Sequence, residues 1–180
     1  MAFLTNRSRP LAVQPIQHVH RADSWFMGRL GVVEANHMAA VRDVMTTDVL
    51  YVMKDTDIYE AIRFLVDGNV TGLPVVDEDR RLVGVVTEKD VLRLLYNVED
   101  GPGTVERHMS SDVVAFDQDD DLRYLVACFR ASHFRRVPIL SEGRLVGIVS
   151  RKDIIRYMKV QQSAEAGLAA TGAEDVLYWG

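Results

Sequence analysis

Gly84-Val85-Val86-Thr87-Glu88-Lys89-Asp90 recurs in this chain as Gly147-Ile148-Val149-Ser150-Arg151-Lys152-Asp153. Each copy is typical of a buried strand that is followed by a hydroxyl residue, two polar residues and a carboxylate. The two copies begin 63 residues apart (147 − 84). Such a fixed period indicates an internal duplication, so we interpret the chain as two repeats of one unit.

The residues around each copy predict the same series of strands and helices. In the first repeat, residues 49–52 form a short β-prone run, and residues 58–66 carry apolar side chains at helical spacing. Segments 70–76 and 82–86 are expected to pair as a hairpin, and a second helix is expected from Thr87. Residues of the second repeat lie 64 positions after their equivalents in the first (105 − 41). After the hairpin turn, which is one residue shorter in the second repeat, the offset is 63. Each unit therefore reads β-α-β-β-α.

The first predicted helix has recognisable signals at both ends. Polar and acidic residues at 54–57 favour a helix start, because acids are stabilised near the positive end of the helix dipole. Gly68 is expected to end the helix, because glycine accepts the left-handed conformation that many helices adopt at their C-terminus.

The segments outside the repeats have different compositions. Residues 1–33 contain four arginines and a single acid, which leaves three interpretations open: a disordered extension, an organelle transit peptide, or an expression-derived segment. The last twenty residues are rich in alanine and glycine and are expected to form a flexible tail. The chain thus divides into an N-terminal extension (1–40), a first unit (41–98), a linker (99–104), a second unit (105–160) and a tail (161–180).

Composition is that of an ordinary globular protein. Hydrophobic residues make up 48% of the chain and charged residues 26%, and the formal net charge is −5. No basic stripe predicts nucleic-acid binding, and no apolar run approaches the roughly 20 residues that span a bilayer. The single cysteine, Cys128, lies in an apolar helical pattern and is expected to be a packing residue. Because one cysteine cannot form a disulfide within the chain, we expect the protein in a reducing compartment. This is the cytoplasm, or the mitochondrion if residues 1–33 act as a transit peptide.

The repeated motif has two interpretations. A hydroxyl residue three positions before a carboxylate, as in Thr87/Asp90 and Ser150/Asp153, is a helix capping box. A helix N-terminus also attracts anions, and Arg135-Arg136 precede a strand expected to lie beside the second copy. Because guanidinium groups bind phosphate oxygens bidentately, this arrangement predicts an anion site.

The two units resemble tandem CBS domains, known as a Bateman module, over about residues 41–159. The resemblance is carried by the stretch 72–76 (Gly-Leu-Pro-Val-Val), which enters the hairpin, and by the two motif copies in register with it. It implies an α+β fold in which the two units pair by pseudo-twofold symmetry through their sheets. It also implies that two such chains dimerise into a disc through helix faces.

The resemblance further implies two pseudo-symmetric nucleotide sites. In CBS modules that bind adenosyl ligands, the aspartate of the motif accepts hydrogen bonds from the ribose, and the hydroxyl residue and nearby basic residues serve the phosphate. The second-unit site would comprise Thr46, Leu50, Val70, Arg135, Arg136, Ile148, Ser150, Lys152 and Asp153. The first-unit site would comprise Val85, Thr87, Lys89, Asp90, Ser110, Val114 and Phe134.

The two sites are not expected to be equivalent. Thr71 and Gly72 occupy the first-unit positions that correspond to Arg135 and Arg136 (135 − 64 and 136 − 64). We therefore expect the second-unit site to bind a charged nucleotide more tightly. The ring of Phe134 is expected to stack on, or to block, an adenine at the first-unit site.

These inferences predict a stand-alone regulatory module. It would bind AMP, ADP, ATP or S-adenosylmethionine, require no cofactor, form a homodimer and modulate an unidentified protein. Nucleic acid, membrane and metal are not expected as partners. Catalysis is not expected either, because the sequence contains no nucleophile–base pair, phosphate loop or metal-ligand cluster. The alternative is a ligand-free interaction scaffold, in which Gly84, Gly147, Thr87 and Ser150 serve only as turn and cap residues.

Overall fold

The structure is a computed structural model that describes residues 39–96 and 103–171. The first unit contains η1 (Val41–Asp43), β1 (Val52–Met53), α2 (Ile58–Asp67), β2 (Gly72–Val76), β3 (Leu82–Thr87), α3 (Glu88–Leu92) and η2 (Arg93–Leu95). The second contains η3 (Val105–Arg107), β4 (Phe116–Asp117), α4 (Leu122–Ala131), β5 (Arg136–Ser141), β6 (Arg144–Ser150) and α5 (Arg151–Thr171). The predicted α+β fold of two like units is confirmed.

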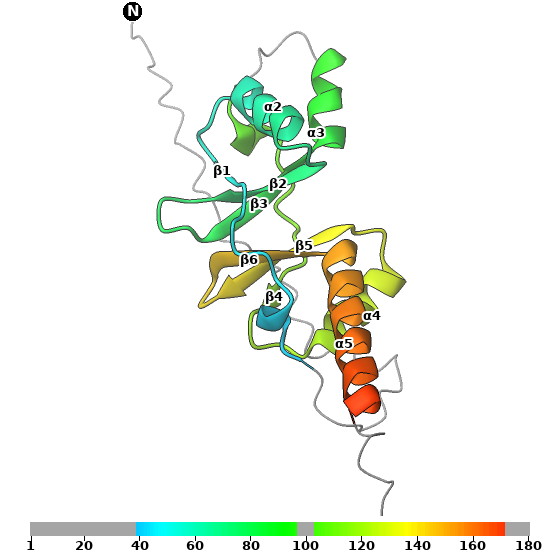
Figure 1. Ribbon diagram of the computed structural model, residues 1–180. Helices are drawn as coiled ribbons and strands as arrows, with labels where there is room; N and C mark the ends of the chain where they lie inside the picture. The colour runs from blue at the N-terminus through cyan, green and yellow to red at the C-terminus, as the bar shows by residue number, and fades with distance from the viewer. Residues whose placement is uncertain (1–38, 97–102, 172–180) are drawn as a thin grey trace, which may run out of the picture.

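Each unit is built on a three-stranded sheet, and the two sheets have the same topology. In the first sheet β1 runs parallel to β2, and β2 runs antiparallel to β3; β4, β5 and β6 repeat this order. The helices cover the outer face of each sheet, so the inner faces meet (Figure 1). The inner layer consists of the buried side chains Val76, Leu82, Val113, Ala115, Leu140 and Leu145. The short first strand was predicted at 49–52, but pairing is confined to Val52 and Met53.

The predicted amphipathic helices α2 and α4 are both present. Asp57 and Asp121 cap them, each accepting a hydrogen bond of 2.8 Å from a backbone N–H in the first turn. Their buried stripes face the sheets, as the sequence spacing predicts. These stripes are Ile58, Ala61 and Leu65 in α2 and Leu122, Leu125, Cys128 and Phe129 in α4.

The end of α2 differs from the prediction in one residue. Gly68 has φ of −76°, an ordinary helical value, and Asn69 takes the left-handed conformation with φ of 48°. Asparagine tolerates this region better than most residues. Gly68 is needed for space instead, because a Cβ there would lie 2.6 Å from Leu50 and 2.7 Å from the carbonyl oxygen of Phe64.

The leading segment of each repeat packs on the other unit. Val41 is buried in the core of the second unit, and its N–H donates to the carbonyl of Asp120 at 2.9 Å. Val105 is buried in the core of the first unit, and its N–H donates to the carbonyl of Thr56 at 2.9 Å. The two units are therefore interlocked, and a repeat defined by sequence is not a unit of packing.

In each unit the segment before the first strand crosses to the other unit, and a glycine there allows it to approach the sheet. Val85 pairs with Ser110 and Ile148 pairs with Thr46, so a segment of each unit lies beside the last strand of the other. At Gly84 a Cβ would lie 2.6 Å from the sulfur of Met109. At Gly147 it would lie 2.5 Å from the sulfur of Met45. The glycine of each motif copy thus makes room for a methionine from the opposite unit, as pseudo-twofold symmetry requires.

Replacing Gly147 with alanine is expected to destabilise the chain by about 1–3 kcal/mol, because the added methyl overpacks the contact with Met45. Urea unfolding would measure the loss. In the double variant Gly147→Ala/Met45→Ala, the clashing sulfur is gone, so the combined loss should be smaller than the sum of the single losses. Strictly additive losses would contradict this packing account.

The C-terminal region also differs from the prediction. Helix α5 continues from Arg151 to Thr171, so residues 161–171, expected to be a flexible tail, are helical. Within the part of the chain that the structure describes, no helix is long and apolar enough to cross a membrane. The predictions for residues 1–38, 97–102 and 172–180 lie outside the described residues.

Candidate functional site: a cavity between the two units

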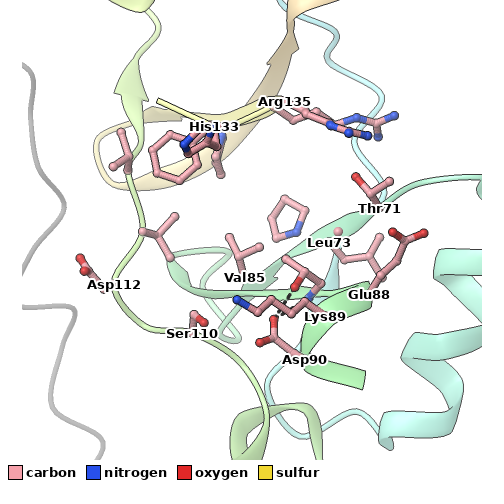
Figure 2. A pocket seen from close by; sticks show the side chains of 18 of the residues that line it. Thr71, Leu73, Val85, Glu88, Lys89, Asp90, Ser110, Asp112, His133 and Arg135 are labelled. Atoms are coloured by element: carbon pink, nitrogen blue, oxygen red, sulfur yellow. Dashed lines mark hydrogen bonds between the residues drawn. The ribbon is translucent and has the colours of Figure 1, made fainter. Parts of the chain in front are cut away.

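A cavity of about 720 Å³ lies between the two units, beside the first copy of the motif (Figure 2). The first unit contributes Thr71, Gly72, Leu73, Pro74, Val85, Thr87, Glu88, Lys89, Asp90 and Arg93. The second contributes Ser110, Asp112, Val113, Val114, His133, Phe134, Arg135, Arg136, Pro138 and Ile148. Side chains far apart in the sequence thus face one space, because the crossing segment after η3 runs alongside β3.

The cavity gathers all seven residues predicted for the first-unit site. Of the residues predicted for the second-unit site, only three line the cavity: Arg135, Arg136 and Ile148. The others do not line it: Thr46, Leu50, Val70, Ser150, Lys152 and Asp153. The arginine pair, expected beside the second motif copy, therefore also faces the first.

The register of the sheets explains why the arginines reach this cavity. Arg136 begins β5 and lies opposite Ser150, while Gly72 begins β2 and lies opposite Thr87. The starts of both strands, with Thr71 and Arg135, line the same cavity. In Figure 2 the labelled Thr71 and Arg135 lie on one side of it. The sequence comparison of the repeats could not reveal that the two strand starts converge.

Asp90 is the most buried charged group in the cavity wall, with 5% of its surface exposed. Its Oδ2 accepts hydrogen bonds from the backbone N–H of Thr87 at 2.9 Å and from the Thr87 hydroxyl at 2.6 Å (Figure 2). The predicted capping interaction is therefore present. Among the described residues, the nearest basic group to Oδ1 is Nη1 of Arg93, 3.9 Å away. This oxygen remains available to a hydrogen-bond donor in the cavity.

The equivalent aspartate of the second unit, Asp153, is bonded more completely. Its Oδ2 accepts from the N–H and the hydroxyl of Ser150 at 2.7 and 2.6 Å. Its Oδ1 accepts from Nη1 of Arg156 at 2.8 Å. Both oxygens of this carboxylate therefore have partners within the chain.

The loop that carries the arginine pair is fixed by a third arginine. The guanidinium group of Arg151 donates to the carbonyl oxygens of Phe129 and Ser132 at 2.9 and 3.0 Å. Cations are favoured there, because helix carbonyls at a C-terminus lack partners. Its contact with the end of α4 holds the segment that leads to Arg135.

The wall combines the groups that an adenosyl ligand requires. Apolar side chains from β2, β3 and β6 form one part of the wall. Phe134 also lines the cavity, and 44% of its surface is exposed. The basic side chains are Lys89, Arg93, Arg135 and Arg136, and the acidic ones are Glu88, Asp90 and Asp112. An apolar surface suits an aromatic base, a carboxylate suits hydroxyl groups, and guanidinium groups suit phosphate.

Several wall residues were not predicted from the sequence: Leu73, Pro74, Glu88, Arg93, Asp112, Val113, His133 and Pro138. Glu88 lies within the motif itself, and Asp112 and Val113 lie between the predicted residues Ser110 and Val114, so their only signal in the sequence was proximity to a predicted residue. Cys128 is buried, as expected, and burial raises the pKa of its thiol above the ordinary value. Its exclusion from the wall agrees with a packing role. In the segments that the structure describes, no group of His, Cys, Asp and Glu side chains could hold a metal ion.

Comparison with known sequences identifies a family for both units. The sequence profile of the CBS domain matches residues 41–97 and 105–160. The CBS domain-containing protein YhcV of Bacillus subtilis is 30% identical over 140 residues, which cover 77% of this chain and 99% of that protein. The uncharacterized protein MJ1225 of Methanocaldococcus jannaschii is 33% identical over 129 residues. That alignment covers 69% of this chain but 46% of the relative, so this chain spans less than half of it.

Solved structures with the same fold contain adenosyl ligands. The structure of CBSX2 of Arabidopsis thaliana, in a complex with AMP, is 28% identical with a TM-score of 0.64, and the match covers 69% of this chain and 99% of that one. The CBS domain pair of protein MJ0100, in a complex with methylthioadenosine and S-adenosyl-L-methionine, is 26% identical with a TM-score of 0.59. That match covers 69% of this chain and 98% of the other.

Proposed function

Because the chain belongs to the CBS-domain family, we propose that it is a regulatory module that binds an adenosyl ligand in the cavity between its two units. The observation that carries the proposal is the position of Asp90. Its buried carboxylate lines the cavity together with basic side chains, and among the described residues its Oδ1 has no hydrogen-bond partner. A binding role, rather than catalysis, fits this set of side chains.

The geometry suggests a role for each part of the wall. Oδ1 of Asp90 accepts hydrogen bonds from the ribose hydroxyls of the ligand. Arg135 and Arg136 donate to its phosphate or carboxylate, for which the planar guanidinium fork is suited. The adenine lies against apolar side chains from both units, such as Val85 and Ile148, and beside the ring of Phe134. The ligand would thus contact both units at once.

This arrangement reverses the ranking that the sequence predicted for the two sites. The second-unit site was expected to bind more tightly because the arginine pair was assigned to it. Since Arg135 and Arg136 line the cavity beside Thr87 and Asp90, we place the principal site there. The candidate ligands are AMP, ADP, ATP and S-adenosylmethionine, and two structural relatives contain members of this group.

Thermal unfolding of the full chain with each candidate ligand tests the proposal. A ligand present at 100 times its dissociation constant adds about 2.7 kcal/mol to the stability of the folded state. For a chain of this size, each kcal/mol raises the unfolding midpoint by about 2–4 °C. We expect at least one ligand to produce such a shift. If none does, the ligand-free scaffold is the better account.

Regulation requires that the ligand-bound state be passed on to another protein. A ligand shifts a conformational equilibrium only if it binds one state more tightly than the other. Because the cavity is formed by both units, we propose that ligand binding alters how they are held together. An unidentified partner would then recognise that change.

A second copy of the chain is the first partner that we propose. Leu92 and Leu95 in the first unit and Ile155 and Met158 in the second are large apolar side chains exposed on the outer helices. They are equivalent pairs, since 155 − 92 and 158 − 95 both equal 63. A repeated apolar surface of this kind marks an interaction site.

The substitution Leu95→Lys is expected to shift the chain toward the monomer, because it places a charge in this apolar surface. Sedimentation analysis over a range of concentrations would measure the change. Val66→Lys is the matched control, because Val66 is equally exposed but lies on α2. If the wild-type chain sediments as a monomer throughout, the dimer proposal is wrong.

A further inference from the structure

The two motif copies differ at one carboxylate oxygen. Oδ1 of Asp153 is hydrogen-bonded to Arg156, whereas Oδ1 of Asp90 lies 3.9 Å from Arg93, beyond hydrogen-bonding distance. Arg93 and Arg156 occupy equivalent positions in the repeats (156 − 93 = 63). The same pair of residue types therefore makes a hydrogen bond in one unit only.

The helices explain this difference. Asp153 and Arg156 both lie in α5, where residues three apart are neighbours on one face. The chain after Asp90 leaves the α-helix at Leu92 and continues from Arg93 as a 3-10 helix. Because the α-helix ends between the two residues, Asp90 and Arg93 do not share the uninterrupted α-helical turn that brings Asp153 and Arg156 together.

We propose that Arg156 closes the second-unit site by occupying the oxygen of Asp153 that a ligand would use, so that each chain binds one adenosyl ligand, beside Asp90. The proposal rests on the proposed function, because Oδ1 matters in this way only if the motif aspartate receives a ligand.

The surroundings of the second-unit site agree with a closed state. The first-unit cavity has the ring of Phe134, whereas the equivalent residue of the other site is Val70 (134 − 64). A ligand at the second-unit site would thus have to displace Arg156 without the contact of that ring. It would meet a cost that is absent beside Asp90.

The bond to Arg156 has one exposed and one buried partner. The Arg156 side chain is 70% exposed, so replacing it should not unfold the chain. The Asp153 side chain is only 10% exposed, and losing a hydrogen bond to a charged group of this kind corresponds to about a tenfold or larger loss of affinity for a ligand that must displace it.

Calorimetric titration of the full chain with AMP, and separately with S-adenosylmethionine, tests the proposal. The wild-type chain should bind one equivalent of the preferred ligand. Arg156→Ala should gain a second binding event, at least tenfold weaker than the first. Lys159→Ala removes an exposed charge from the same helix and should leave both stoichiometry and affinity unchanged. Adding Asp153→Asn to Arg156→Ala should abolish the second event.

Two results would overturn the proposal while leaving the proposed function intact. One is two binding events in the wild-type chain, and the other is a single event in Arg156→Ala. If neither ligand binds the wild-type chain, the proposed function itself is wrong, and this inference falls with it.

Discussion

Replacing Asp90 with alanine is expected to weaken binding of the preferred adenosyl ligand by at least 100-fold. A hydrogen bond to a charged group contributes about 1.5–3 kcal/mol, and the carboxylate can accept from both ribose hydroxyls. Losing two such bonds removes about 3–6 kcal/mol, and each 1.4 kcal/mol corresponds to a tenfold change in affinity. Isothermal titration of the wild-type and variant chains would measure the change.

Asp153→Ala is the matched control for this substitution. Both aspartates accept the same two hydrogen bonds from the hydroxyl residue three positions earlier, so both variants lose a helix cap worth about 0.5–2 kcal/mol. Only Asp90 lines the cavity. We therefore expect similar losses of stability and a loss of binding in Asp90→Ala alone. Equal losses of affinity in the two variants would contradict the assignment of the site.

Replacing Val105 with aspartate is expected to destabilise the whole chain by about 3–5 kcal/mol. Val105 has no exposed surface and lies in the core of the first unit, where a carboxylate would be buried without a partner. Because the residue belongs to the second repeat by sequence, the account predicts that both units unfold together in one transition. Urea unfolding followed by circular dichroism would measure both the loss and its cooperativity.

The neighbouring residue provides the control for Val105→Asp. Glu106 is exposed, and its contact with the first unit is made by its backbone N–H, which donates to the carbonyl of Lys54. Glu106→Gln keeps that bond and should change stability by no more than about 0.5 kcal/mol. If Val105→Asp unfolded only the second unit, the interlocked arrangement would be wrong.

Local structure was predictable because it depends on short sequence patterns. The cap at Asp57 and the stripe from Ile58 to Leu65 follow from side-chain hydrogen bonds and helical spacing. Where a pattern allowed two physical solutions, the prediction was less exact. At the end of α2 either Gly68 or Asn69 could take the left-handed conformation; Asn69 takes it, and Gly68 is needed for space beside Leu50.

Features that depend on how the two units meet were not predictable from one sequence. Nothing near Val41 or Val105 indicates that each packs on the opposite unit, because an apolar residue fits either core. The strand that contains Gly84 was predicted, but nothing in the sequence indicates that the two motif glycines make room for methionines from the other unit. The position of the arginine pair depends on the same inter-unit geometry.

A crystal structure of the full chain grown with its preferred ligand would test the central claim most directly. The account predicts one bound ligand per chain, with ribose hydroxyls on Oδ1 of Asp90 and with Arg135 and Arg136 on its charged end. Arg156 would remain on Asp153. Ligand bound beside Ser150 and Asp153, with the cavity next to Asp90 empty, would contradict the account.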